Sequence, residues 1–258
     1  MDICVTGASR GLGRSLCKCL VTRGHRVWGV ARDEKKLHAL MASLPQGMFF
    51  ASALDLGDAA SVTAWTQELV SASFVPDIIV LNASIQENDM DAGSYDHSVG
   101  HHVLQVNLEG ALQCVEEFLP TFLKRGRGRF VAVTSTVALR PSVRSTSYAA
   151  SKAGLAMAFR TLRLRFAPRS VQFALAVLGP IATEMWEGTK DSFLIPSVDQ
   201  TAESLASFVL SSAETLHYPF LSTTLLRLSL WMPDQWFSCL SKRFLKNDRS
   251  ITEQPKTK

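Results

Sequence analysis

Short apolar runs and longer amphipathic segments alternate along most of this chain. Each apolar run is bounded by polar or glycine-rich residues, as buried strands usually are. The runs predict strands at residues 3–6, 26–31, 49–54, 77–81, 129–134 and 171–177.

Between these runs, apolar residues recur with the period of a helix. The spacing predicts helices at residues 15–20 and 59–73, around 106–110, and from just before 148 to about 166. This alternation is typical of an α/β fold with a doubly wound parallel sheet of the Rossmann type, with helices on both faces.

Length and composition favour one domain followed by a tail. No linker, repeat or low-complexity tract divides the 258 residues, and a hydrophobic content of 47% is enough for a large core. We therefore expect a single domain at residues 1–217 and an unusual apolar tail at residues 218–258.

The net charge of +4 is unevenly distributed. Residues 1–217 hold 20 basic and 20 acidic side chains, whereas residues 218–258 hold seven and three. A balanced main body argues against binding of nucleic acid. The excess makes the tail the place to look for contact with an anionic surface.

Cysteine and histidine spacing gives no metal site. The five cysteines form no C-x-x-C pair, which favours a reducing, cytoplasmic compartment. His97, His101 and His102 lack a carboxylate or cysteine at ligand spacing, so we expect surface histidines and no metal. The chain shows neither a signal-peptide pattern nor a run of eighteen apolar residues that could span a membrane.

A glycine-rich turn, G-x-x-x-G-x-G, joins the first predicted strand to a helix. Glycines let a backbone approach a pyrophosphate closely, and the first amides of the helix supply donors. A tight turn without a ligand is the alternative. The residues expected to contact a cofactor here are Gly7, Ser9, Arg10, Gly11, Leu12 and Gly13.

The second strand indicates which dinucleotide would bind. NAD-binding folds usually place an acid at its end, whereas an arginine there accommodates a 2′-phosphate. Here Ala31 is followed by Arg32, and Arg10 offers a second cation. The pattern favours NADP(H), unless both arginines are simply solvated.

Tyr148 and Lys152 lie four residues apart, on one face of a predicted helix. A phenol titrates near ~10 and becomes a useful acid or base when a nearby cation lowers its pKa. Lys152 can supply that charge, although a solvated lysine above a half-buried tyrosine would show the same spacing.

In this order and at these intervals, the motifs resemble the short-chain dehydrogenase/reductase family in its short single-domain branch. The resemblance covers residues 2 to about 185. It rests on Thr6, the glycine turn, Asp55, Asn82, Ala83, Asn107, Ser135, Tyr148, Lys152, Gly179 and Thr183.

The resemblance implies a role for each polar residue. Tyr148 would exchange a proton with the substrate oxygen, and Ser135 would hydrogen-bond that oxygen. Lys152 would hold the nicotinamide ribose and lower the pKa of Tyr148, and Asn107 would keep a water in a proton relay. Further NADP(H) contacts are implied at Asp55, Asn82, Ala83, Gly179, Ile181 and Thr183, as is a homo-oligomer, either a dimer or a tetramer.

Three departures from the family pattern stand out. Ser84 replaces a glycine of the Asn-Asn-Ala-Gly motif, and the proline near Gly179 comes one place late, at Pro180. The usual seventh strand, with its Val-Asp-Gly-Gly ending, is not found before the tail. Its loss would alter the usual assembly and disfavour an acyl-carrier-protein substrate.

The tail combines leucine, tryptophan and phenylalanine with flanking cations, the composition of a helix in a membrane interface. It also resembles the C-terminal segment of membrane-associated members of the family. Packing on the enzyme's own core or on a second subunit is the alternative. We expect a substrate lid at about residues 184–200, while Arg140 and Arg144 could meet an anionic group or stay solvated.

Together these features predict an NADPH-dependent reductase of a lipophilic ketone or aldehyde, or the reverse oxidation. The protein would be cytoplasmic, with possible peripheral contact with a membrane. Two non-enzymatic alternatives are a sensor that binds NADPH without turnover and a membrane-surface adaptor built on the tail.

Overall fold

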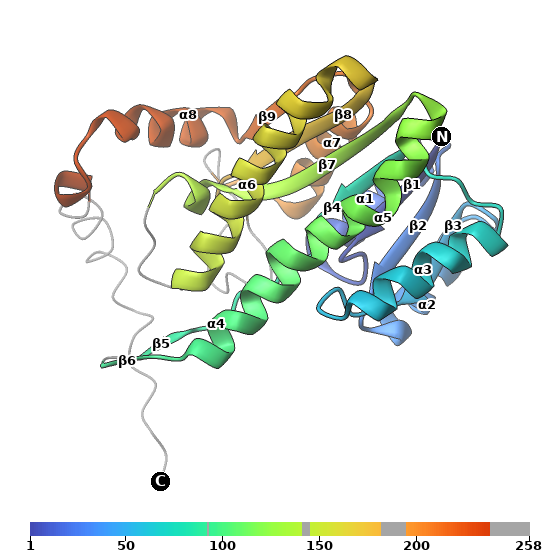
Figure 1. Cartoon of the computed structure of the whole chain (residues 1–258), viewed down its shortest axis with the longest axis horizontal. Helices are drawn as coiled ribbons and strands as arrows, with labels where there is room; N and C mark the ends of the chain where they lie inside the picture. Colours follow the sequence, from blue (N-terminus) through green and yellow to red (C-terminus); the bar gives the residue numbers. More distant parts are fainter. Residues whose placement is uncertain (92, 141–144, 182–194, 238–258) are drawn as a thin grey trace, which may run out of the picture.

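We describe the protein from a computed structural model. The structure describes residues 1–91, 93–140, 145–181 and 195–237. Figure 1 shows one sheet between two layers of helices, with helix α8 (Phe220–Leu228) extending from its edge.

The sheet has seven strands, and every neighbouring pair is parallel. Their order is β3-β2-β1-β4-β7-β8-β9, so the chain reverses its direction of winding between β1 and β4. This confirms the predicted doubly wound sheet, and it opens a crevice at the carboxyl ends of these two strands. The strands are β1 (Asp2–Thr6), β2 (Arg26–Ala31), β3 (Phe49–Ala53), β4 (Ile78–Leu81), β7 (Gly128–Ser135), β8 (Val171–Leu178) and β9 (Thr215–Tyr218).

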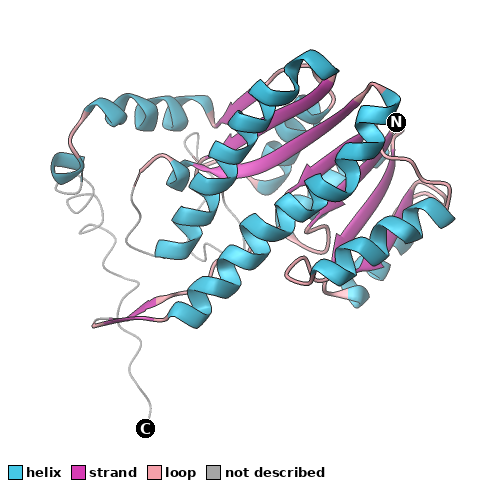
Figure 2. Ribbon diagram, viewed as in Figure 1, coloured by secondary structure: helices cyan, strands magenta, loops and turns pink. Residues whose placement is uncertain are grey.

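Helices cover both faces of the sheet (Figure 2). On one face α1 (Gly11–Thr22), α2 (Glu34–Ala42) and α7 (Val198–Val209) form one core with Ile3 and Val5 of β1. On the other face, the helices α3 (Ala59–Ser71), α5 (Gly110–Arg125) and α6 (Thr146–Phe166) form a second core that includes Cys4. Because successive side chains of a strand point to opposite faces, the fully buried strands read as the continuous apolar runs seen in the sequence.

The structure corrects one prediction, since a seventh strand is present. β9 pairs with β8 from Leu175↔Thr215 to Leu178↔Tyr218. It escaped notice because it is a four-residue edge strand that alternates Leu216 and Tyr218 with the polar Thr215 and His217. The predicted domain boundary between residues 217 and 218 falls inside this strand.

The segment between β4 and α5 holds a small hairpin of β5 (Met90–Asp91) and β6 (Ser94–Tyr95), then α4 (His97–Leu104). α4 continues into a π-helical turn, η1 (Gln105–Glu109), which leads into α5. The three histidines of α4 lie on the surface or at the flank of this helix, as predicted. Among the described residues, no group of three His, Cys, Asp or Glu side chains could hold a metal ion, and no helix is long and apolar enough to cross a membrane.

Short 3₁₀ turns join other elements. They are η2 (Thr136–Ala138) after β7, η3 (Ala167–Arg169) after α6 and η4 (Ser229–Trp231) after α8.

Candidate active site

The glycine turn between β1 and α1 is packed too tightly for side chains. A Cβ atom on Gly13 would lie 2.1 Å from the Gly7 carbonyl oxygen, and one on Gly7 would lie 2.8 Å from the Cα of Ala83. Gly7 and Gly11 also adopt positive φ angles of 72° and 52°, which favour glycine. The turn therefore lies close against the end of β4 and exposes its backbone to the crevice.

Thr6 joins the ends of β1 and β4. Its hydroxyl oxygen accepts hydrogen bonds from the backbone amides of Asn82 and Ala83, both at 3.0 Å. The Asn82 side chain in turn donates to the Thr6 carbonyl oxygen at 3.0 Å. These bonds fix the rim of the crevice on which the Asn82-Ala83 motif lies.

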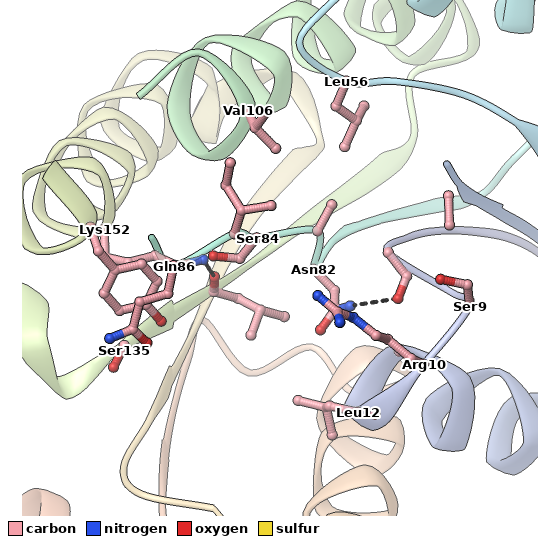
Figure 3. A pocket seen from close by; sticks show the side chains of 18 of the residues that line it. Ser9, Arg10, Leu12, Leu56, Asn82, Ser84, Gln86, Val106, Ser135 and Lys152 are labelled. Atoms are coloured by element: carbon pink, nitrogen blue, oxygen red, sulfur yellow. Dashed lines mark hydrogen bonds between the residues drawn. The ribbon is translucent and has the colours of Figure 1, made fainter. Parts of the chain in front are cut away.

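A single large cavity of about 1150 Å³ runs along this rim. Figure 3 shows Lys152 and Ser135 at one end and Arg10 at the other. Of the predicted site residues, those that line the cavity are Gly7, Ser9, Arg10, Gly11, Leu12, Gly13, Arg32, Asp55, Asn82, Ala83, Ser135, Tyr148, Lys152, Gly179 and Ile181. Thr183, Arg144 and residues 184–194 of the predicted lid lie outside the described residues.

The cavity end near Arg32 carries a further cation that the sequence reading missed. Lys36 also lines it, four residues after Arg32, and this spacing was the signal that could have revealed it. The neighbouring Asp33 accepts a hydrogen bond from the Lys36 amide at 3.0 Å as the N-cap of α2, and its carboxylate pairs with the Lys36 ammonium group. Three cations, Arg10, Arg32 and Lys36, therefore line this end of the cavity, and the neighbouring acid Asp33 is paired with Lys36.

Tyr148 projects from α6 beside Ser135, which ends β7. Burial raises the pKa of Tyr148 above its usual value of 10, and the neighbouring Ser135 and Ser84 hydroxyls lower it by less. The net direction is opposite to the predicted effect of Lys152, because burial dominates. Ser84, the departure from the family motif, places its buried hydroxyl beside the Tyr148 phenol.

Lys152 is buried in the wall of the cavity. Its ammonium group donates to the Val133 carbonyl oxygen at 3.0 Å and lies 5.8 Å from the centre of the Tyr148 ring. Burial lowers the pKa of Lys152 from 10.5 to about 8. The ammonium group has no carboxylate partner among the described residues, so a polar ligand in the cavity could offer it acceptors.

Asn107 lies in the π-helical turn η1, behind the cavity and not in its wall. Its side-chain amide accepts from the Ile85 amide and donates to the Ile85 carbonyl oxygen, both at 2.8 Å, and it also donates to Ser151 at 3.1 Å. Asn107 thus fixes the strand-end loop that carries Ser84 against helix α6. Its predicted role in a water relay stays a prediction.

Asp89 is a second functional residue that the sequence reading missed. Its carboxylate is fully buried and accepts hydrogen bonds from the amides of Thr146 and Ser147, at 3.0 and 2.6 Å. It therefore caps α6 two residues before Tyr148 and holds the start of the helix that carries Tyr148 and Lys152. No local motif points to it, because its partners lie more than 55 positions away in the chain.

Comparison with known proteins agrees with this geometry. The family model described as short chain dehydrogenase matches residues 2–192. A 3-oxoacyl-[acyl-carrier-protein] reductase, FabG, of Buchnera aphidicola is 27% identical over 187 residues, which is 71% of this chain and 74% of the relative.

A plant relative and a solved structure show further likeness. An NADPH-dependent pterin aldehyde reductase of Arabidopsis thaliana is 33% identical over 156 residues, 58% of this chain and 62% of the relative. The structure of an alcohol dehydrogenase from Thermococcus sibiricus, complexed with 5-hydroxy-NADP, superposes with a TM-score of 0.73 at 23% identity. That match covers 84% of this chain and 94% of the other.

The matched region spans every described strand except β9 and includes the glycine turn, Ser135, Tyr148 and Lys152. The chain therefore belongs to the short-chain dehydrogenase/reductase family of oxidoreductases, whose members act on carbonyl and alcohol groups.

Proposed function

We propose that the protein is an NADPH-dependent reductase of a lipophilic ketone or aldehyde, or catalyses the reverse oxidation. The observation that carries this proposal is one continuous cavity, with a glycine cradle at one end and the Ser135, Tyr148 and Lys152 side chains at the other. A cofactor fits such a cavity because the glycine backbone approaches a pyrophosphate where a Cβ atom would clash.

Arg10, Arg32 and Lys36 support NADP(H) over NAD(H). Arg10 and Arg32 are exposed at the cavity end where the strand-end acid of an NAD site would be expected. Asp33, the nearest acid, is committed to the cap of α2. A 2′-phosphate would meet guanidinium groups, which bind phosphate oxygens in a bidentate manner.

The cofactor, when bound, supplies or accepts the hydride. The Tyr148 hydroxyl gives its proton to the substrate oxygen in reduction and removes it in oxidation. Ser135 donates a hydrogen bond to the same oxygen as it gains charge. Lys152, whose ammonium group lies 5.8 Å from the Tyr148 ring, favours the phenolate that remains and binds the cofactor ribose.

A lipophilic substrate is supported by the apolar side chains beside this pair. Ile85, Val137 and Ile181 line the same end of the cavity. The relatives also include a reductase of 3-oxoacyl thioesters. Since β9 is present, the loss of a seventh strand no longer argues against that substrate class, so it belongs in the test.

We also propose that the chain forms a homo-oligomer through α6. Met157 and Leu164 stand 57% and 81% exposed on the outer face of this helix, where burial against a second copy would stabilise the assembly. Sedimentation equilibrium would test it; a monomer at every concentration would contradict it.

The experiment is a panel of ketones, aldehydes, quinones and 3-oxoacyl thioesters, with NADPH oxidation followed by absorbance. The variant Tyr148→Phe should lose on the order of 10²–10⁴-fold in turnover, while Tyr95→Phe, which alters a half-exposed tyrosine outside the cavity, should lose little. Turnover by Tyr148→Phe equal to that of the wild type would contradict the mechanism. Tight NADPH binding without turnover on any compound would favour the sensor or the adaptor instead.

A further inference from the structure

The C-terminal arm, which we define as α8, η4 and the residues to Phe237, exposes a concentrated set of large apolar side chains. Trp231 is 92% exposed, and Leu225 is 57% exposed. Soluble surfaces seldom gather so many large apolar groups in one short segment. The exposed members are Phe220, Leu221, Leu225, Leu228, Leu230, Trp231 and Trp236.

Three of the exposed side chains share one side of α8. At about 100° per residue, Leu221, Leu225 and Leu228 lie within one narrow sector of α8. Thr223 lies on the opposite side, fully buried, and its hydroxyl donates to the Pro219 carbonyl oxygen at 2.7 Å. The helix thus turns the side that carries Thr223 toward Gly179 and exposes these leucines on its opposite side. Figure 1 shows α8 extending from the edge of the sheet.

Arg140 fixes the far end of the arm to the catalytic domain. Its guanidinium group is buried and donates to the Ser229 hydroxyl at 3.2 Å and the Met232 carbonyl oxygen at 2.7 Å. It also pairs with Asp234 and packs 4.8 Å from the Phe237 ring centre. Arg140 lies five residues after Ser135, so the arm is anchored beside the catalytic end of the cavity.

Charge distinguishes between the surfaces that could cover the arm. The arm itself carries one basic residue, Arg227, and one acid, Asp234, which is already paired with Arg140. The sequence that follows the arm, residues 238–258, adds six basic and two acidic side chains. A second copy would bring two such basic segments together, whereas anionic lipid headgroups complement them. Tryptophan, with its apolar body and polar edge, suits the boundary between acyl chains and headgroups.

We propose that the apolar side of the C-terminal arm docks on an anionic membrane surface, without spanning it. This contact holds the catalytic end of the cavity near the bilayer, where a lipophilic carbonyl compound would be concentrated. The inference that substrate comes from the bilayer rests on the proposed reductase function, whereas the docking itself does not.

The test is co-sedimentation of the full chain with vesicles of phosphatidylcholine containing phosphatidylserine, and with vesicles of phosphatidylcholine alone. We expect binding to the first, weakened by added salt. The double variant Leu225→Ser/Trp231→Ser should bind at least about tenfold more weakly, since two large apolar groups no longer leave water. Val70→Ser, which replaces a 77% exposed apolar residue on α3, should bind like the wild type.

Unchanged vesicle binding in the double variant, or no binding by the wild type, would overturn the proposal. So would a wild-type dimer that the double variant alone dissociates, because a second copy would then occupy the arm. Turnover of the compounds in the panel, measured without vesicles, separates the two proposals. Vesicle binding without turnover would refute the reductase and keep the docking, and turnover without vesicle binding would do the reverse.

Discussion

Replacing Lys152 by methionine should make the folded chain more stable while removing activity. The folded state holds this ammonium group in a buried site, where its pKa falls from 10.5 to about 8. At ~1.4 kcal/mol for each tenfold change in proton affinity, the penalty at pH 7 is about 3 kcal/mol. Loss of the hydrogen bond to the Val133 carbonyl oxygen offsets about 1 kcal/mol, so Lys152→Met should gain about 2 kcal/mol.

The pH dependence gives a sharper test. Below pH 8 both the folded and the unfolded wild-type chain hold the Lys152 proton, so the full penalty is present. Between pH 8 and 10.5 the folded chain releases this proton and the unfolded chain keeps it. The wild type therefore gains stability as the pH rises through this window, and the advantage of Lys152→Met shrinks.

Urea unfolding at several pH values, without cofactor, would measure both effects. Lys124→Met is the matched control, because Lys124 is exposed on α5 and its replacement should change stability by less than ~0.5 kcal/mol. A variant Lys152→Met that is no more stable than the wild type at pH 7 would refute the reasoning. So would a stability difference that stays constant from pH 7 to pH 10.

Three further predictions concern other parts of the site. Arg32→Asp should shift the ratio of kcat/KM for NADPH and NADH toward NADH, and an unchanged ratio would contradict the 2′-phosphate assignment. Ser84→Gly removes a hydroxyl that lowers the pKa of Tyr148, so the rise of alcohol oxidation with pH should move to higher pH, whereas Ser84→Thr should leave it in place. Asp89→Asn should cost about 1–2 kcal/mol of unfolding free energy at pH 7. Burial raises the pKa of Asp89, but hydrogen bonds from Ser147 and Thr146 together outweigh burial and lower this pKa below 3.8. The contribution is therefore present above that pH and declines as the pH falls through the lowered pKa, and a urea difference that does not shrink on acidification would count against the cap.

Much of the fold could be read from local pattern. Buried parallel strands are continuous apolar runs, and the predicted 26–31 strand matches β2 from Arg26 to Ala31. β9 could not be read this way, because a short edge strand with one buried side carries little signal. The register of β9 comes from its pairing with β8, which the sequence does not display.

The candidate site likewise contains residues that a local sequence pattern reveals and residues that it does not. The residues that line the cavity follow strand ends and a glycine turn, which local spacing reveals. Asp89 and Arg140 act through partners far away in the chain, about 57 and 90 positions distant. From the sequence alone, Arg140 could equally be a solvated loop arginine, because nothing local shows that the C-terminal arm buries it.

The π-helical turn η1 makes the candidate site sensitive to insertions and deletions within this turn. A helix that advances about 100° per residue accommodates one additional residue at such a turn. Deleting a residue within η1 would rotate all of α5 relative to α4, turning Phe118 and Phe122 away from the sheet or Asn107 away from Ile85. Evolution in this stretch should therefore proceed by substitution, while changes in length collect in the β5–β6 hairpin, where an added residue disturbs neither helix.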